Sequence, residues 1–382
     1  MAPALLILQP TPYCGLDCRY CYLQTRNDRS RMSADTLVAV ARNILGPIPP
    51  EQRPTVVWHG GEPTTLPPDW YEQAFALMER ESGGHPLSHA FQTNAVGVGR
   101  AWTRLWRRWN VSIGVSIDGP ADLHDLSRLT RGGRGSHAIT MRGIREIQRA
   151  GIDMHVITVL TAASLGRADD LYDFYRENGL RRVAFNAEEE EGQTGGSTLS
   201  PGADTVTAYR AFIRRFLARA ADDPEPVSCR EIESVHQMLR LPHEKRGLNP
   251  QVMPFEIVTV AVDGGMSTFS PELIGVASPE HGNFVFGNVR DGGLDVMDAH
   301  PAFRRTMSEI TAGVTACHAS CDLFDICGGG TPANKFFELG SFAGTETLYC
   351  RLTRRALLET VLEDIERRGP DLVPSDRRKA AS

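Results

Sequence analysis

Two hydrophobic periods alternate along the first half of the chain. Short β-branched and aromatic runs predict strands, and stretches with an apolar residue at every third or fourth position predict helices between them. The predicted strands are Ala4–Gln9, Thr55–Trp58, His89–Thr93, Val111–Ile117, Met154–Leu160 and Arg182–Asn186. The predicted helices are Ser33–Leu45, Pro67–Arg80, Arg100–Trp109, Ser136–Ala150 and Gly166–Asn178. Alternating strands and helices pair in parallel through right-handed crossovers, so we expect an open or closed α/β barrel with its chemistry at the C-terminal strand ends.

The second half has a different pattern. An acidic run followed by Gly-Gly-Ser in 188–201 predicts a connection out of the barrel, and helices are expected at 202–220 and 229–241. Phe255–Thr268 predicts a hairpin, because β-branched residues flank a turn that favours positive φ angles. A Gly-rich loop with cysteines follows, and then a last helix. We therefore divide the chain into a barrel (1–190), a helical connection (191–250), a cysteine-bearing region (251–368) and a flexible tail (369–382).

Composition narrows the class of protein. The chain has 382 residues, 41% of them hydrophobic, with 41 Lys and Arg against 47 Asp and Glu. A net charge of -6 lacks the basic surface that nucleic-acid binding requires. The apolar run Ala4–Leu8 is too short for a signal peptide or a membrane span. We expect a soluble cytoplasmic protein with neither a nucleic-acid nor a membrane partner, in which clustered cysteines serve as metal ligands or catalysts rather than disulfides.

The first cysteine group is Cys14, Cys18 and Cys21, a CxxxCxxC motif directly after the first predicted strand. Three thiolates on one loop can hold three irons of a [4Fe–4S] cluster and leave the fourth iron open. The alternatives are a zinc site, which normally needs a fourth N or S ligand, or three unrelated buried cysteines. Tyr20 and Tyr22 beside the third cysteine favour the cluster.

The second cysteine group is Cys317, Cys321 and Cys327, joined by Cys350 after 22 intervening residues. Four thiolates coordinate a cluster fully, and a fully coordinated cluster can carry electrons. A closed tetrahedral zinc site satisfies the same ligands and remains the alternative. The eighth cysteine, Cys229, stands apart and is interpreted as an ordinary buried thiol.

The first motif, with an aromatic residue at Tyr20 before its last cysteine, resembles the radical S-adenosylmethionine (SAM) superfamily. The resemblance implies a partial (β/α)6 barrel in which the open iron binds SAM, whose reductive cleavage yields a hydrogen-abstracting 5′-deoxyadenosyl radical. Gly60-Gly61-Glu62-Pro63 follows the second strand and resembles the family's GGEP motif, whose backbone contacts the SAM amino group. Taken alone, the Gly-Gly pair is only a turn.

Further SAM contacts are implied near the fourth strand. Ser116 and Asp118 fall on one face of that strand by alternation, where family members use polar residues on the SAM ribose and carboxylate. Arg128 stands where relatives often carry an arginine near the SAM carboxylate. A solvated strand end is the alternative for each. Gln92-Thr93-Asn94, at the end of the third strand, either lines the cavity or forms structural hydrogen bonds.

The second cysteine group resembles the SPASM/twitch extension of radical SAM peptide maturases, with departures. Ser270 and Thr331 stand where a full SPASM domain has cysteines, and one extra residue separates Cys317 from Cys321. The resemblance therefore implies one auxiliary cluster, and two [4Fe–4S] clusters in all. Glu272 lies near the position of an acidic base in sulfatase-maturating relatives and is the candidate catalytic base; a salt-bridged or solvated glutamate is the alternative.

Phrases around Cys14, Glu62 and Cys327 resemble the cyclophane-forming peptide maturases, which join an aromatic ring carbon to the β-carbon of a nearby residue. The implied partners are a ribosomally made precursor peptide and an electron donor such as flavodoxin or ferredoxin. Too few residues precede Cys14 for a leader-binding domain, so leader recognition is expected from the barrel, the 191–250 region or a separate protein. The alternatives are a peptide epimerase, a thioether-forming or sulfatase-type maturase, and a non-catalytic iron–sulfur or zinc scaffold.

Overall fold

A mostly parallel sheet forms the centre of the computed structural model, which describes residues 2–23, 25–191 and 196–369. Within these ranges the sheet has nine strands in the order β7-β6-β5-β4-β3-β2-β1-β8-β9. Strands β1 to β6 pair in parallel with their neighbours, so the predicted α/β fold with a six-stranded partial barrel is confirmed. They are β1 Leu5–Leu8, β2 Thr55–Trp58, β3 His89–Thr93, β4 Ser112–Ser116, β5 Met154–Leu160 and β6 Arg182–Ala187.

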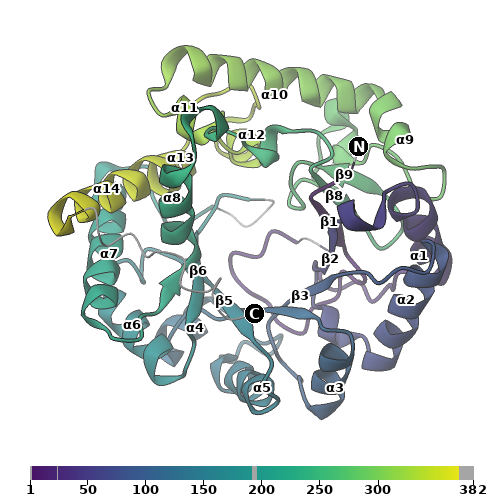
Figure 1. The fold of residues 1–382 in the computed structure, drawn as a ribbon, viewed down its shortest axis with the longest axis horizontal. Coiled ribbons are helices and arrows are strands. Elements are labelled where there is room, and N and C mark those ends of the chain that lie inside the picture. The colour runs from purple at the N-terminus through teal and green to yellow at the C-terminus, as the bar shows by residue number, and fades with distance from the viewer. Residues whose placement is uncertain (1, 24, 192–195, 370–382) are drawn as a thin grey trace.

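Helices cover the outer side of the curved sheet (Figure 1). They follow the prediction closely, with α4 as an unpredicted addition: α1 Ala34–Ala39 with its π-helical continuation η1 Val40–Leu45, α2 Pro68–Glu81, α3 Arg100–Arg108, α4 Ala121–Ser127, α5 His137–Arg149 and α6 Ala168–Glu177. Their apolar faces bury large aromatic side chains, including Trp58 and Tyr71, whose rings meet edge to face at 5.2 Å. Burying such rings against the sheet is the main favourable term for this layer.

Both edges of the barrel are extended by strands from later in the chain. The short β7, Ser228–Cys229, pairs with β6. The predicted hairpin is present as β8 Ile257–Val260 and β9 Met266–Thr268, which pair antiparallel. However, β8 also pairs in parallel with β1, so the hairpin extends the barrel sheet. The division of the chain at residues 190 and 250 stays a prediction.

The C-terminal region lies across the open side of the sheet (Figure 1). Its longest helix, α10, begins at Pro301 and ends at Ser320. The expectation that a Gly-rich loop holds the second cysteine group was wrong for most of its members: Cys317 lies in the last turn of α10, and Cys327 and Cys350 end the short helices α11 and α13. Some of the glycines that suggested a loop, such as Gly328 at positive φ, end short helices instead of forming one continuous loop.

The remaining helices flank these elements. The two predicted after the barrel, α7 Ala203–Asp222 and α8 Arg230–Arg240, pack on the C-terminal helix. The C-terminal region contains α9 Leu294–Ala299, α11 Phe324–Cys327, α12 Pro332–Leu339, α13 Leu348–Cys350, the π-helix η7 Arg351–Ala356 and α14 Leu357–Arg368. Short 3-10 turns are η2 Pro50–Gln52, η3 Pro63–Thr65, η4 His243–Lys245, η5 Pro250–Val252 and η6 Pro279–Phe284. The predicted tail lies outside the described residues from 370 onward. None of the described helices is long and apolar enough to cross a lipid bilayer.

Candidate active site

A cavity of about 280 Å³ lies among the C-terminal ends of the barrel strands. Its walls come from the loop after β1, the Gly-Gly turn after β2, the ends of β3 and β4, and the segments that follow β6 and β9. All three thiols of the first cysteine group line it. The position agrees with the rule that α/β barrels carry their chemistry at this end.

The loop that carries the first cysteine group is held by backbone and guanidinium contacts. Arg131 donates from Nε and Nη2 to the carbonyl of Cys14 at 3.0 and 2.9 Å. The amide of Asn94 lies 3.7 Å from the Cys14 sulfur. Burial raises the pKa of Cys14 to about 12 and that of Cys18 to about 11, so both are thiols until a bound metal replaces the proton.

This donor set fits an iron–sulfur cluster with one open iron. Three sulfur ligands from one loop border a single cavity, and cubane irons take one thiolate each. Among the residues that the structure describes, no three His, Cys, Asp or Glu side chains converge on a point that could hold a single metal ion. The loop therefore presents sulfur ligands around a space rather than around one ion.

The turn after β2 requires glycine at two positions. Gly60 and Gly61 have φ angles of +82° and +60°, a region that L side chains rarely adopt. A Cβ on Gly61 would also lie 2.4 Å from the carbonyl oxygen of Thr11. The turn thus packs against the start of the cluster loop and leaves its backbone facing the cavity.

Glu62 ties the same turn to the end of β3. Its Oε1 accepts from the Thr93 hydroxyl at 2.6 Å, and its Oε2 accepts from the backbone N–H of Asn94 at 2.7 Å. Both the hydroxyl and the N–H of Thr64 also donate to Oε1, at 2.7 and 2.9 Å, directly after Pro63. Burial raises the pKa of Glu62, whereas these hydrogen bonds oppose the rise. The carboxylate of Glu62 therefore stabilises the turn through these hydrogen bonds. The neighbouring residues Gln92, Thr93 and Asn94 line the cavity.

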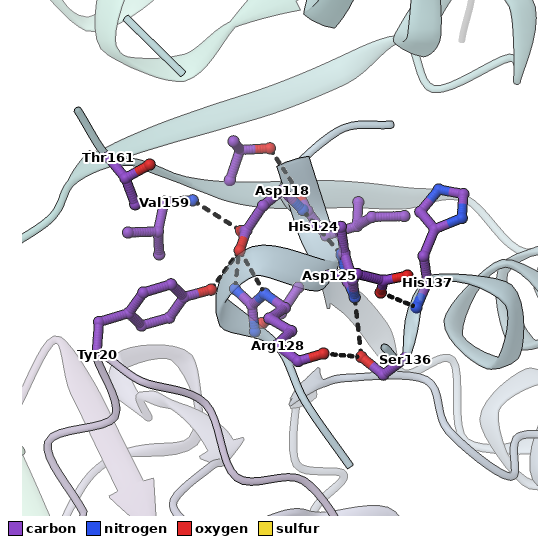
Figure 2. A network of polar contacts seen from close by, with 12 residues as sticks. Tyr20, Asp118, His124, Asp125, Arg128, Ser136, His137, Val159 and Thr161 are labelled. Atoms are coloured by element: carbon purple, nitrogen blue, oxygen red, sulfur yellow. Dashed lines mark hydrogen bonds and ion pairs between the residues drawn. The ribbon is translucent and has the colours of Figure 1, made fainter. Parts of the chain in front are cut away.

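Asp118 is the centre of a buried polar network (Figure 2). Its carboxylate accepts from Arg128 Nε at 2.9 Å and Nη2 at 3.1 Å, and from the backbone N–H of Val159 at 3.0 Å. The hydroxyl of Tyr20 donates to the same carboxylate. Asp118 and Arg128 are only 5% and 7% exposed. Because Tyr20 belongs to the cluster loop, this network joins that loop to β5.

The side chains of Ser116 and Asp118 differ in placement, although strand alternation puts them on one face. Ser116 lines the cavity, where its hydroxyl accepts from Gln92 Nε2 at 2.9 Å. Asp118 is not among the described residues that line the cavity, because β4 ends at Ser116 and the chain turns. Arg128 does line it. Direct contact of Ser116, Asp118 or Arg128 with SAM stays a prediction.

Besides Glu62, three glutamates form part of the cavity wall. Glu272 follows β9, and Glu189 and Glu191 follow β6. Burial raises the pKa of Glu189 to about 7, and it raises the pKa of Glu191 and Glu272 as well. Asn334 donates to Glu189 at 2.5 Å, and the Ser270 hydroxyl donates to Glu272. Partly buried carboxylates with raised pKa values in a cavity are candidates for proton transfer.

Glu189 and Glu191 were not predicted as site residues, because residues 188–201 have the pattern of a connection out of the barrel. Their position directly after a strand of a parallel barrel could have indicated the site, because such barrels carry their chemistry at the C-terminal strand ends. His59 was also given no role from the sequence. Its side chain lines the cavity, and its Nε2 lies 3.2 Å from the Tyr22 hydroxyl. Burial lowers the pKa of His59 to about 4, so this imidazole is neutral at pH 7.

The second cysteine group surrounds a separate cavity of about 180 Å³, which all four thiols line. Cys317 is buried, and the other three are partly exposed. Four sulfur ligands from α10, α11, α13 and the loop after α10 around one space fit a fully coordinated cluster. Cys229 lies elsewhere, in β7.

Comparisons with known proteins place the fold and the first motif in a family. A profile of the radical SAM superfamily matches residues 8–175. An uncharacterized protein of Synechocystis sp. is 38% identical over 95% of this chain and 92% of its own length. A serine-type anaerobic sulfatase-maturating enzyme of Klebsiella aerogenes is 30% identical, but over only 50% of this chain and 48% of that enzyme.

Solved structures agree in fold across nearly the whole chain. Native anSMEcpe with bound AdoMet and the Cp18Cys peptide superposes with a TM-score of 0.78 at 19% identity, covering 97% of this chain and 99% of that one. Streptococcus suis SuiB bound to the precursor peptide SuiA superposes with a TM-score of 0.64 at 17% identity, covering 91% and 76%. The likenesses to solved structures show the fold alone. The profile match, which includes the cysteine loop at the strand ends, places residues 8–175 in the radical SAM superfamily and, with the maturase relatives, indicates an enzyme.

Proposed function

We propose that this enzyme modifies a ribosomally made precursor peptide by joining the β-carbon of one residue to the aromatic ring of another, which forms a cyclophane. The observation that carries the proposal is one cavity that combines the first cysteine group with partly buried carboxylates, together with a second cavity lined by four thiols. Ring closure needs these three elements: a radical source, a proton acceptor and an electron acceptor. The bound peptides of anSMEcpe and SuiB support a peptide substrate here.

The first cysteine group would hold a [4Fe–4S] cluster and SAM, which supplies the hydrogen-abstracting radical when bound. The backbone of Gly60 and Gly61 faces the place where the SAM amino group is expected. Ser116 and Arg128 line the same cavity and are proposed to orient the rest of SAM, while Asp118 fixes the Arg128 guanidinium. The second cysteine group would hold the auxiliary [4Fe–4S] cluster.

We propose Glu272 as the base that takes the ring proton during rearomatisation. Glu272→Gln removes the proton acceptor but not the first cysteine group, so we expect 5′-deoxyadenosine to form at a normal rate while modified peptide falls by about 100-fold, within the usual range for general-base catalysis. Both products can be measured in one reaction by liquid chromatography with mass spectrometry.

Glu190→Gln is the matched control, because Glu190 is exposed and does not line the cavity among the described residues. It should leave both products unchanged. Normal peptide modification by Glu272→Gln would assign Glu272 a structural role and direct the search for the base to Glu189.

The product itself tests the reaction. Each cyclophane removes two hydrogens overall, so coexpression with the precursor peptide should yield peptide about two mass units lighter per crosslink. Fragments should be missing between the aromatic residue and its partner. The decisive substrate contains no cysteine, because a thioether also loses two hydrogens but consumes a thiol. An unchanged mass would rule out cyclophane formation and leave the radical SAM assignment intact.

Two alternative reactions are separated by the same sample. A formylglycine made from serine is also lighter by about two mass units, but the backbone of that product fragments normally. An epimerase leaves the mass unchanged in ordinary water and needs a hydrogen donor. Cys229 is the thiol outside both cysteine groups; it is 3% exposed, its thiol lies 3.4 Å from Glu231, and it is not among the described residues that line the cavity. This placement disfavours it as that donor.

Electron delivery and leader recognition complete the proposal. A flavodoxin or ferredoxin is proposed as the donor to the first cluster, in the cytoplasm where thiols stay reduced. Leader recognition is proposed to come from the barrel, the 191–250 region or a separate leader-binding protein.

A further inference from the structure

Lys335 is a buried lysine directly beside the second cysteine group. It lies in α12, and its side chain is 3% exposed. Its Nζ donates to the Sγ of Cys317 at 3.3 Å and to the carbonyl oxygen of Gly313 at 3.2 Å. Gly313 and Cys317 are four residues apart in α10, so the ammonium group sits against one turn of that helix.

A lysine is rarely buried unless an anion compensates its charge. Among the described residues, no carboxylate forms an ion pair with Lys335, and its two acceptors are a neutral carbonyl and the Cys317 sulfur. The anion that fits this place is therefore a thiolate. Cysteine ligands bind iron as thiolates, so an iron–sulfur cluster on the second cysteine group would supply that charge.

Cations near the first cysteine group are arranged differently. Arg128 and Arg26 act on the Cys18 thiol, but Arg128 pairs with Asp118, and Arg26 lies 2.7 Å from Asp17. Glu62 adds a carboxylate beside Cys14. The two cysteine groups thus differ in their direct contacts. At the second an ammonium donates to a ligand sulfur, whereas at the first Arg131 donates to the Cys14 carbonyl and Arg128 and Arg26 are paired with carboxylates.

We propose that Lys335 raises the reduction potential of the cluster held by Cys317, Cys321, Cys327 and Cys350. This inference rests on the proposed function, in which that cluster accepts the electron released on ring closure. Hydrogen bonds to ligand sulfurs and nearby positive charge stabilise the reduced, more negative state of a cluster. Lys335 acts through Cys317 and is a positioning residue.

The test is a redox titration followed by electron paramagnetic resonance in the full-length chain. Cys14, Cys18 and Cys21 are replaced by alanine, so that the signal belongs to the second cluster. In this background Lys335→Met should lower the ratio of reduced to oxidised cluster at fixed ambient potential by about tenfold, a 59 mV shift for a one-electron couple. Lys335→Arg keeps the charge and should restore most of the ratio.

Lys245→Met is the matched control, because it removes the same charge from an exposed position in η4 where solvent screens it. It should leave the ratio unchanged. An unchanged ratio in Lys335→Met with about four irons retained would overturn the inference.

Replacing Lys335 could also remove the second cluster altogether, and a further variant distinguishes this from a change in its potential. Lys335→Gln, a neutral variant that can still donate a hydrogen bond, is therefore titrated in parallel. Loss of iron from both neutral variants would overturn the inference, since Lys335 would then be needed to hold the cluster rather than to set its potential. A parent chain that binds zinc or no iron would instead contradict the proposed second cluster.

Discussion

We expect Cys14→Ala to lose reductive cleavage of SAM completely and Cys321→Ala to retain it. The reason is that the two thiols line different cavities. Three thiols at the first would leave one iron of a cluster open for SAM, whereas four thiols at the second would coordinate a cluster fully. Cys321→Ala should still release 5′-deoxyadenosine but should yield little modified peptide, because the proposed ring closure would lose its proposed electron acceptor. Both products are measured in anaerobic assays with dithionite as reductant.

Metal analysis makes this comparison quantitative. Reconstituted wild-type protein should contain about eight irons and eight sulfides, and each variant about four irons. Cys229→Ala is the control, because this buried thiol belongs to neither group. Four irons with bound zinc in the wild type would contradict an auxiliary iron–sulfur cluster. Normal peptide product from Cys321→Ala would limit the second cysteine group to a structural role.

Asp118→Asn should destabilise the fold by roughly 3–5 kcal/mol, the usual result of removing one partner from a buried ion pair. The loss is large because Arg128 would keep a buried charge without its carboxylate, and because Tyr20 and the Val159 N–H bond the same group (Figure 2). The free energy of unfolding is measured by urea denaturation under anaerobic conditions. SAM cleavage should fall as well, since Tyr20 anchors the cluster loop through Asp118.

Two variants calibrate that result. Glu81→Gln removes a carboxylate from the Arg42 ion pair, in which Arg42 is 64% exposed, and should cost less than about 1 kcal/mol. Tyr20→Phe removes one hydrogen bond and leaves the Asp118–Arg128 pair intact, so a loss of about 1 kcal/mol is expected. If Asp118→Asn cost no more than Glu81→Gln, the network would not be what holds the loop.

Most of the barrel was predictable from the sequence because its information is local. A run such as Met154–Leu160 has the composition of a buried strand wherever it lies, and the observed β5 has the same bounds. The cysteine spacing is equally local, since Cys14, Cys18 and Cys21 lie on one short loop. The α/β class, the six parallel strands and the two cysteine groups followed from these patterns alone.

The convergence of distant segments was not predictable in the same way. Local pattern does not state that β8 pairs with β1, or that Glu272 lies in one cavity wall with Glu189. Strand alternation put Asp118 on the cavity face, but the strand ended two residues earlier and Arg128 bonded the carboxylate.

The parallel barrel and the thiols of both cysteine groups follow from the sequence alone, because strand patterns and cysteine spacing act within a few residues. Which carboxylates share the cavity, and which ammonium donates to Cys317, depends on the tertiary structure. Glu189 and Glu272 meet in one cavity wall, and Lys335 reaches Cys317, although the two residues of each pair are separated in the sequence. These placements depend on the crossover connections and on helix packing. Packing of this kind is determined by the burial of the whole core, which no single stretch of sequence encodes.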